Sequence, residues 1–130
     1  MERLTKIINQ RHRIANQYNQ ALSSLPLQIP WQHQDSFSSY HLYIIRLKLD
    51  QINKTHPQIH DELCDLGVLV NLHYIPVHRH PYYEQLGFKK NDYPEAEKFY
   101  QEVISIPIYP TFHNGNQKYV IETLQKVMTA

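Results

Sequence analysis

The chain has 130 residues, a formal net charge of +1 and ordinary shares of hydrophobic (42%) and charged (19%) residues. This length and composition are typical of one globular domain. A nearly neutral chain argues against nucleic-acid binding, and no apolar run approaches the ~20 residues of a membrane span. Cys64 is the only cysteine, and residues 1–6 hold no apolar signal-peptide core. We therefore expect a cytoplasmic protein.

The first part of the chain predicts a long helix, an irregular segment and a strand. Apolar residues recur at helical spacing over residues 2 to about 24. Residues 26–38 are rich in proline and polar residues, and Trp31 is expected to anchor this loop against the core. Residues 40–49 alternate as a central strand. Its more apolar face is expected to meet the helices and holds Tyr43, Ile45, Leu47 and Leu49.

A helix and a second strand follow. Residues 55–66 are predicted to be helical, with Thr55 as the N-cap and Gly67 just past the C-terminus. Residues 68–74 then alternate as a mostly buried strand, which Pro76 ends because proline cannot donate to a ladder.

The last part predicts a helix over 95–103, a short strand over 104–108 and a final helix that starts at Asn114 or Asn116. The buried face of the 95–103 helix is expected to hold Ala96, Phe99, Tyr100 and Val103. The predicted fold class is α+β. Residues 1–130 form a single domain, with a small, mainly antiparallel three-stranded sheet backed on one face by about four helices.

The stretch from Gly67 to Gly87 carries the densest set of chemically active side chains. Pro76 and Pro81 stiffen it, because proline fixes φ. Rigid loops at the end of a strand commonly carry binding residues. Composition alone also allows a proline-rich connection whose aromatic rings fill a gap in the core. The side chains concerned are His73, Tyr74, His78, Arg79, His80, Tyr82 and Tyr83.

The histidines are candidate metal ligands, and the single cysteine is a candidate nucleophile. His56 and His60 have i, i+4 spacing, and His73, His78 and His80 could converge. Neither set has a cysteine or carboxylate at a recognised ligand spacing, so no metal site is predicted. Cys64 lies in an apolar helical stripe, as a small buried hydrophobe does, so it is not expected to be a nucleophile. Histidine is a common acid–base catalyst, so acid–base work by His73 or His78 stays open, but no catalytic residue is assigned.

An ordered set of motifs resembles one enzyme family. The run His73-Tyr74-Ile75-Pro76-Val77-His78, followed by Pro81-Tyr82-Tyr83 and Gly87, resembles a hallmark of the DegT/DnrJ/EryC1/StrS nucleotide-sugar aminotransferases. It is most similar to the branch that acts in pseudaminic-acid biosynthesis. Further similar segments are Arg13-Ile14-Ala15 with Tyr18, Ser39 to Tyr43, Tyr93 to Glu97 and Ser105 to Pro110.

The resemblance implies the C-terminal small domain of a fold-type-I aminotransferase dependent on pyridoxal phosphate (PLP). Such an enzyme transfers an amino group, from glutamate, to a 4-keto nucleotide sugar. The PLP-binding large domain is expected to be absent, so this chain alone is expected to bind no PLP and to be inactive. The substrate-binding residues that the resemblance implies are His73, Tyr74, His78 and Tyr83. The histidines would donate hydrogen bonds to sugar or phosphate oxygens, and the tyrosines would pack on the sugar ring.

Two other functions stay open at this point. The chain could be a freestanding nucleotide-sugar-binding module, or an oligomerisation domain without catalysis. The long first helix has no preceding element to pack on. Its expected partner is a large PLP domain or a second copy of the same chain.

Overall fold

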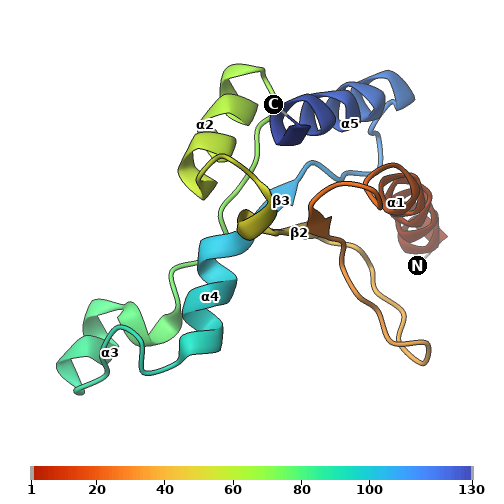
Figure 1. The fold of residues 1–130 in the computed structure, drawn as a ribbon. Coiled ribbons are helices and arrows are strands. Elements are labelled where there is room, and N and C mark those ends of the chain that lie inside the picture. Colours follow the sequence, from red (N-terminus) through yellow and green to blue (C-terminus); the bar gives the residue numbers. More distant parts are fainter. Residues whose placement is uncertain (1, 130) are drawn as a thin grey trace.

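The computed structural model describes residues 2–129, drawn as a ribbon in Figure 1. Within this range the chain forms five α-helices, three β-strands and two 3₁₀ helices. The helices are α1 (Glu2–Ala21), α2 (His56–Asp65), α3 (Pro81–Gln85), α4 (Pro94–Glu102) and α5 (Asn114–Thr129). The strands are β1 (Leu27–Gln28), β2 (Tyr43–Leu47) and β3 (Val103–Ile106), and the 3₁₀ helices are η1 (Leu49–Gln51) and η2 (Val77–Arg79).

The sheet is antiparallel with the order β1-β2-β3, as the α+β prediction requires. In its register Tyr43 opposes Ile106 and Leu27 opposes Leu47. Figure 1 shows α1, α2 and α5 on one side of the sheet, and α3 and α4 on the other. The expectation that all helices back one face was therefore wrong, because α4 leads into β3 from the opposite side.

The hydrophobic core lies between the sheet and α1, α2 and α5. The predicted apolar face of β2 is buried there, whereas Ile44 and Arg46 on its other face are partly exposed. Burial of apolar surface stabilises the folded state by about 25 cal/mol for each Å² removed from water. The fully buried members with the largest side chains include Ile14, Tyr18, Leu22, Ile59, Leu63, Ile104 and Leu124.

The predicted strand over 68–74 was wrong except at one residue. Asn71 and Ser105 exchange both backbone hydrogen bonds, at 2.8 and 3.1 Å, in an isolated bridge at the free edge of β3. An antiparallel ladder would next need the N–H groups of residues 103 and 107. Val103 already donates its N–H to Phe99 at the end of α4, and Pro107 has none. The ladder therefore cannot extend in either direction.

The third strand of the sheet is instead β1, in a segment that was predicted to be irregular. Pro26 and Pro30 flank it, and only two of its residues pair with β2. Trp31 just beyond it is 77% exposed, so its expected role as a loop anchor was wrong. The segment stays on the edge of the sheet, where prolines are tolerated.

The ends of α2 form as the sequence predicts. Thr55 and Gln58 make a reciprocal capping box at the N-terminus. At the C-terminus Gly67 has φ +76° and donates to Cys64 (2.9 Å), while Val68 donates to Leu63 (2.9 Å). This pair of bonds is a Schellman motif, which a left-handed glycine closes without a steric penalty. The chain then turns toward the segment that carries His73.

Two features of the α3–α4 region differ from the sequence-based predictions. The residues from Pro81 to Gln85 form the short helix α3, where the sequence predicted a rigid loop. On α4 the buried residue is Glu97, whereas Phe99, placed on the predicted apolar face, is 43% exposed. The carboxylate is buried because it has hydrogen-bonding partners on η2, as described below.

Among residues 2–129, no helix combines the length and the apolar character needed to cross a membrane.

Candidate functional site

A cavity of about 370 Å³ opens between η2, α3 and α4, in the lobe that lies below the sheet in Figure 1. Two of the four predicted substrate-binding residues, His78 and Tyr83, line it. Its lining is largely apolar, which is typical of small-molecule sites that also carry a few polar groups. The remaining lining residues are Pro76, Val77, Phe88, Tyr93 and Ala96.

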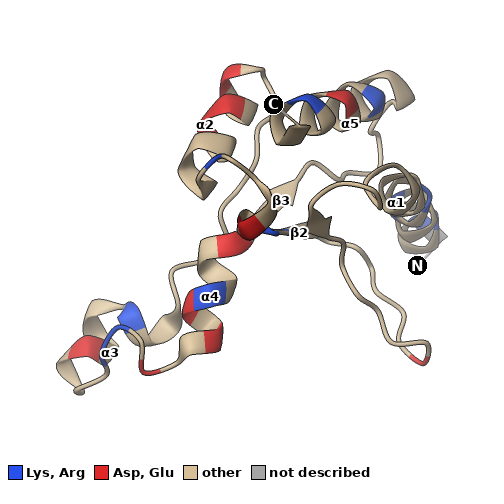
Figure 2. Ribbon diagram, in the orientation of Figure 1, with Lys and Arg blue, Asp and Glu red and all other residues tan. Residues whose placement is uncertain are grey.

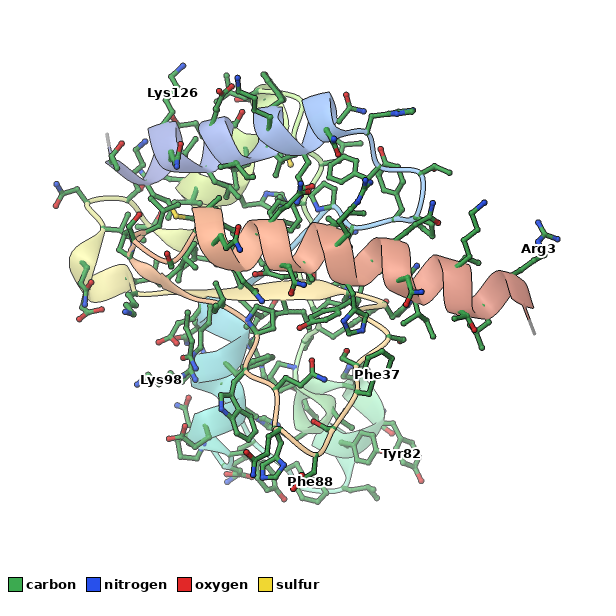
Figure 3. The ribbon with its side chains drawn as sticks, turned by 90° about the vertical axis from the view of Figure 1, so that its right-hand side faces the viewer. Arg3, Phe37, Tyr82, Phe88, Lys98 and Lys126 are labelled. Atoms are coloured by element: carbon green, nitrogen blue, oxygen red, sulfur yellow. The ribbon has the colours of Figure 1, made fainter. Side chains whose placement is uncertain are left out.

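Aromatic rings make contiguous contacts around this cavity. The ring of Phe88 lies 6.2 Å from that of Tyr83 and 6.2 Å from that of Tyr93, centroid to centroid. The His78 ring is 5.0 Å from the Tyr93 ring. Figure 3 shows Phe88 in this lobe, with Tyr82 nearby. Aromatic pairs at such distances add to packing stability beyond the area they bury, so the walls of the cavity support each other.

His78 is buried, with 7% of its surface exposed, and does not project freely toward solvent. Its Nε2 lies 2.8 Å from Oε1 of Glu97, which is itself 3% exposed. Arg79 places Nη1 3.3 Å from the other carboxylate oxygen, Oε2, and its guanidinium lies 5.7 Å from the Tyr100 ring centroid. These contacts join η2 to α4 and thereby hold the lobe together.

The other two predicted residues, His73 and Tyr74, form a separate pair in the segment that leads to η2. Nδ1 of His73 lies 2.9 Å from the hydroxyl oxygen of Ser105, a buried residue of β3. Tyr74 is 76% exposed and its ring meets the His73 ring edge-on at 6.2 Å. The structure thus brings His73 together with Tyr74, and His78 together with Tyr83, in two neighbouring pairs along one segment.

Residues outside the predicted set complete the site. Glu97 and Ser105 orient the two histidines, and Phe88 and Tyr93 supply cavity wall. Ser105 has a visible signal in the sequence, as a polar residue between Ile104 and Ile106, and Tyr93 and Glu97 end a segment that resembles the family. Phe88, Tyr93 and Glu97 lie 10 to 19 positions from His78, and only the tertiary fold brings them to the site.

His56 and His60, the helical pair with the spacing of metal ligands, each have a hydrogen-bonding partner within the chain. Nε2 of His56 lies 2.9 Å from the backbone oxygen of Val103, and Nδ1 of His60 lies 2.9 Å from Oδ1 of Asp61. Over the described residues 2–129, no group of three His, Cys, Asp or Glu side chains is arranged to hold a metal ion.

The fold matches one part of solved aminotransferases of fold type I. Aminotransferase TlmJ from Streptoalloteichus hindustanus matches with a TM-score of 0.85 and 24% identity, over 98% of this chain and 33% of that one. Helicobacter pylori PseC, an aminotransferase involved in the biosynthesis of pseudoaminic acid, matches with a TM-score of 0.83 and 23% identity, over 95% of this chain and 33% of its own. At these identities the likeness shows the fold alone.

Residues 1–125 match the model of the DegT/DnrJ/EryC1/StrS aminotransferase family, and the chain belongs to this family of PLP-dependent sugar aminotransferases. Spore coat polysaccharide biosynthesis protein SpsC of Bacillus subtilis is 31% identical over 98% of this chain and 34% of its own length. Spr1654 from Streptococcus pneumoniae matches in its PLP form with a TM-score of 0.82 and 28% identity, over 95% of this chain and 31% of that one. The chain therefore spans about a third of the length of these relatives.

Proposed function

We propose that this chain is the substrate-contacting small domain of an aminotransferase that transfers an amino group, from glutamate, to a 4-keto nucleotide sugar. The observation that carries the proposal is the placement of His78 and Tyr83 around one cavity, beside the His73–Tyr74 pair, in a domain of this family. The His73-to-His78 run is the ground for proposing a pseudaminic-acid-type substrate within the family.

The proposed roles follow from exposure and hydrogen bonding. Ser105 holds Nδ1 of His73, which leaves Nε2 to bind a sugar or phosphate oxygen. The exposed ring of Tyr74 offers a flat apolar surface for a sugar ring, and the half-exposed Tyr83 joins that surface to the cavity. The loop between the two pairs is stiffened by Pro76, which lowers the entropy lost when a ligand binds.

The residues that line the cavity do not fit PLP. They include no lysine to form a Schiff base and no arginine or lysine to hold the cofactor phosphate. When bound, PLP supplies the electron sink for transamination, and a protein contributes its binding and orientation. We therefore assign the cofactor to a large domain of the family type, as the partner of this chain, and expect this chain alone to be inactive.

The test is an NMR titration of the 130-residue chain with UDP-N-acetylglucosamine as the probe. We expect chemical-shift changes centred on His73, Tyr74 and Tyr83. His73→Ala should weaken binding about fivefold, the equivalent of one hydrogen bond of about 1 kcal/mol. Phe99→Ala, which changes an exposed aromatic residue of α4 outside the cavity lining, is the matched control and should leave binding unchanged.

A second measurement tests the assignment of PLP. Chain mixed with PLP and glutamate should show no transamination and no lysine adduct that borohydride traps in one-to-one stoichiometry. Such an adduct at one lysine would refute the assignment. Absence of any shift change with the UDP sugar would favour an oligomerisation domain instead.

A further inference from the structure

The Glu97 carboxylate is the buried charged group that the proposed binding roles leave unexplained. It lies on α4, one residue past Ala96 of the cavity wall, and both of its oxygens have partners on η2. Burying a carboxylate is costly unless it is paired and hydrogen-bonded. Figure 2 shows residues of both charge signs on α4 and around α3, so this lobe combines both signs within a small region.

The charges of the cluster balance when the His78 ring carries one proton and is neutral. Arg79 carries a permanent positive charge and lies 3.3 Å from Glu97, so the two form a neutral pair. A second positive charge on the buried His78 ring would leave the cluster with a net charge of +1, at a desolvation cost. The His78 ring also lies 5.0 Å from the ring of Tyr93.

The carboxylate also decides which nitrogen of a neutral His78 carries the hydrogen. An ionised carboxylate only accepts hydrogen bonds, so at 2.8 Å from Oε1 the His78 Nε2 must donate. Nδ1 of the same ring then carries the lone pair. His73 differs, because its partner is the Ser105 hydroxyl, which donates or accepts equally well.

We propose that Glu97 is a positioning residue that fixes His78 in the Nε2–H tautomer, so that His78 offers the cavity a hydrogen-bond acceptor. A ligand hydroxyl or amide N–H is the matching donor. This refines the expected role of His78, which was to donate to sugar or phosphate oxygens. Only the identity of the ligand rests on the proposed function; the tautomer does not.

The test is ¹⁵N NMR of the histidine rings of the 130-residue chain at pH 8, where histidine is ordinarily neutral. We expect His78 to show a protonated Nε2 and an unprotonated Nδ1. Glu97→Gln keeps the shape of the side chain, but an amide both donates and accepts, so the His78 ring nitrogens should shift toward a tautomer mixture. Glu95→Gln makes the same change two residues earlier, on an exposed side chain of α4, and should leave His78 unchanged.

The wild-type spectrum alone is decisive if Glu97→Gln fails to fold. A His78 ring with Nδ1–H, or with both nitrogens protonated at pH 8, would overturn the proposal. A purely structural Glu97 would alter the melting temperature in Glu97→Gln but leave the His78 tautomer as in wild type, which would also overturn it.

Binding measurements with a UDP sugar distinguish a failure of this inference from a failure of the proposed function. Glu97→Gln should weaken binding of UDP-N-acetylglucosamine about twofold, because an even tautomer mixture halves the fraction of His78 that offers an acceptor, whereas Glu95→Gln should not. If the tautomer is as expected and the wild type binds no UDP sugar, the proposed function fails and the assignment of Glu97 stands. If the wild type binds the UDP sugar but His78 is not the Nε2–H tautomer, the proposed function stands and the assignment of Glu97 fails.

Discussion

At the scale of single residues, two buried tyrosines join α1 to the sheet. The Tyr18 hydroxyl donates to the backbone oxygen of Pro107 (2.9 Å), and the Tyr43 hydroxyl donates to Oδ1 of Asn19 (2.6 Å). Tyr18→Phe removes the first bond and leaves a carbonyl without its partner. We expect a loss of about 1–3 kcal/mol in the free energy of unfolding, measured by urea denaturation.

The control for Tyr18→Phe is Tyr82→Phe, which deletes the hydroxyl of an exposed tyrosine on α3. This change should stay within about 0.5 kcal/mol of wild type, as surface substitutions usually do. Equal losses in the two variants would contradict the assigned role of the Tyr18 hydrogen bond.

The same two tyrosines predict a loss of stability in alkaline solution. Burial, with a smaller contribution from neighbouring phenols, raises the pKa of Tyr18 and of Tyr43 well above the ordinary value of 10.0. Above pH 10 the unfolded chain releases these protons while the folded chain retains them, so the free energy of unfolding falls. The slope should reach about 1.4 kcal/mol per pH unit for each such tyrosine. Below pH 10 both states stay protonated and these groups give no pH dependence.

Urea unfolding between pH 9 and pH 12, in about half-unit steps, checks this slope. In Tyr18→Phe one of the two groups is gone, so the decline should be shallower than in wild type. An unchanged slope in that variant would show that Tyr18 does not cause it.

The site illustrates which residues a sequence can reveal. His73, Tyr74, His78 and Tyr83 stand in one short run that resembles a motif of the family, so the resemblance implied them together. Glu97 was missed because its neighbours on α4 suggested an apolar face, and a lone carboxylate beside alanine and lysine reads as solvent-exposed. Its burial depends on His78 and Arg79, which lie 18 to 19 positions away. No local pattern carries that information.

At the scale of elements, the glycine that closes α2 can be tested directly. Gly67 has φ +76°, and a Cβ there would meet nothing within 4 Å, so only backbone strain would oppose a side chain. Gly67→Ala should therefore cost about 1–2 kcal/mol of stability, measured by thermal unfolding. Gly115→Ala, in the first turn of α5 and also free of clashes, should be neutral or stabilising by up to about 1 kcal/mol.

A Gly67→Ala variant as stable as Gly115→Ala would show that α2 ends without a left-handed residue.

The ends of α2 were predictable because Thr55 and Gly67 act through bonds to residues within the same helix. The extent of the 68–74 strand was not. It depends on Val103, whose N–H is already used at the end of α4, and on Pro107 just past β3, which has no N–H to donate. Only the tertiary pairing brings these two residues opposite the 68–74 segment.

At the scale of the whole molecule, α1 is longer than the body it packs on. Its second half is buried through Ile14, Ala15 and Tyr18. Its first turns extend past the rest of the chain, with Arg3 at the projecting end (Figure 3). Leu4 there is 58% exposed, and Ile7 is also exposed. Because this chain spans about a third of its relatives' length, the projecting turns are where we expect a large domain of the family, or a second copy, to pack.

Without such a partner, the projecting turns should drive self-association of the chain. We expect the mean mass from light scattering to rise with concentration, because pairing removes Leu4 and Ile7 from water. The double change Leu4→Lys, Ile7→Lys should abolish the rise, and circular dichroism should show that α1 stays helical, since lysine is a good helix former. Leu69→Lys alters an even more exposed leucine on the segment after α2 and should leave association intact. A strictly monomeric wild type at its highest soluble concentration would show that these turns do not drive self-association, and would leave a large domain as their proposed partner.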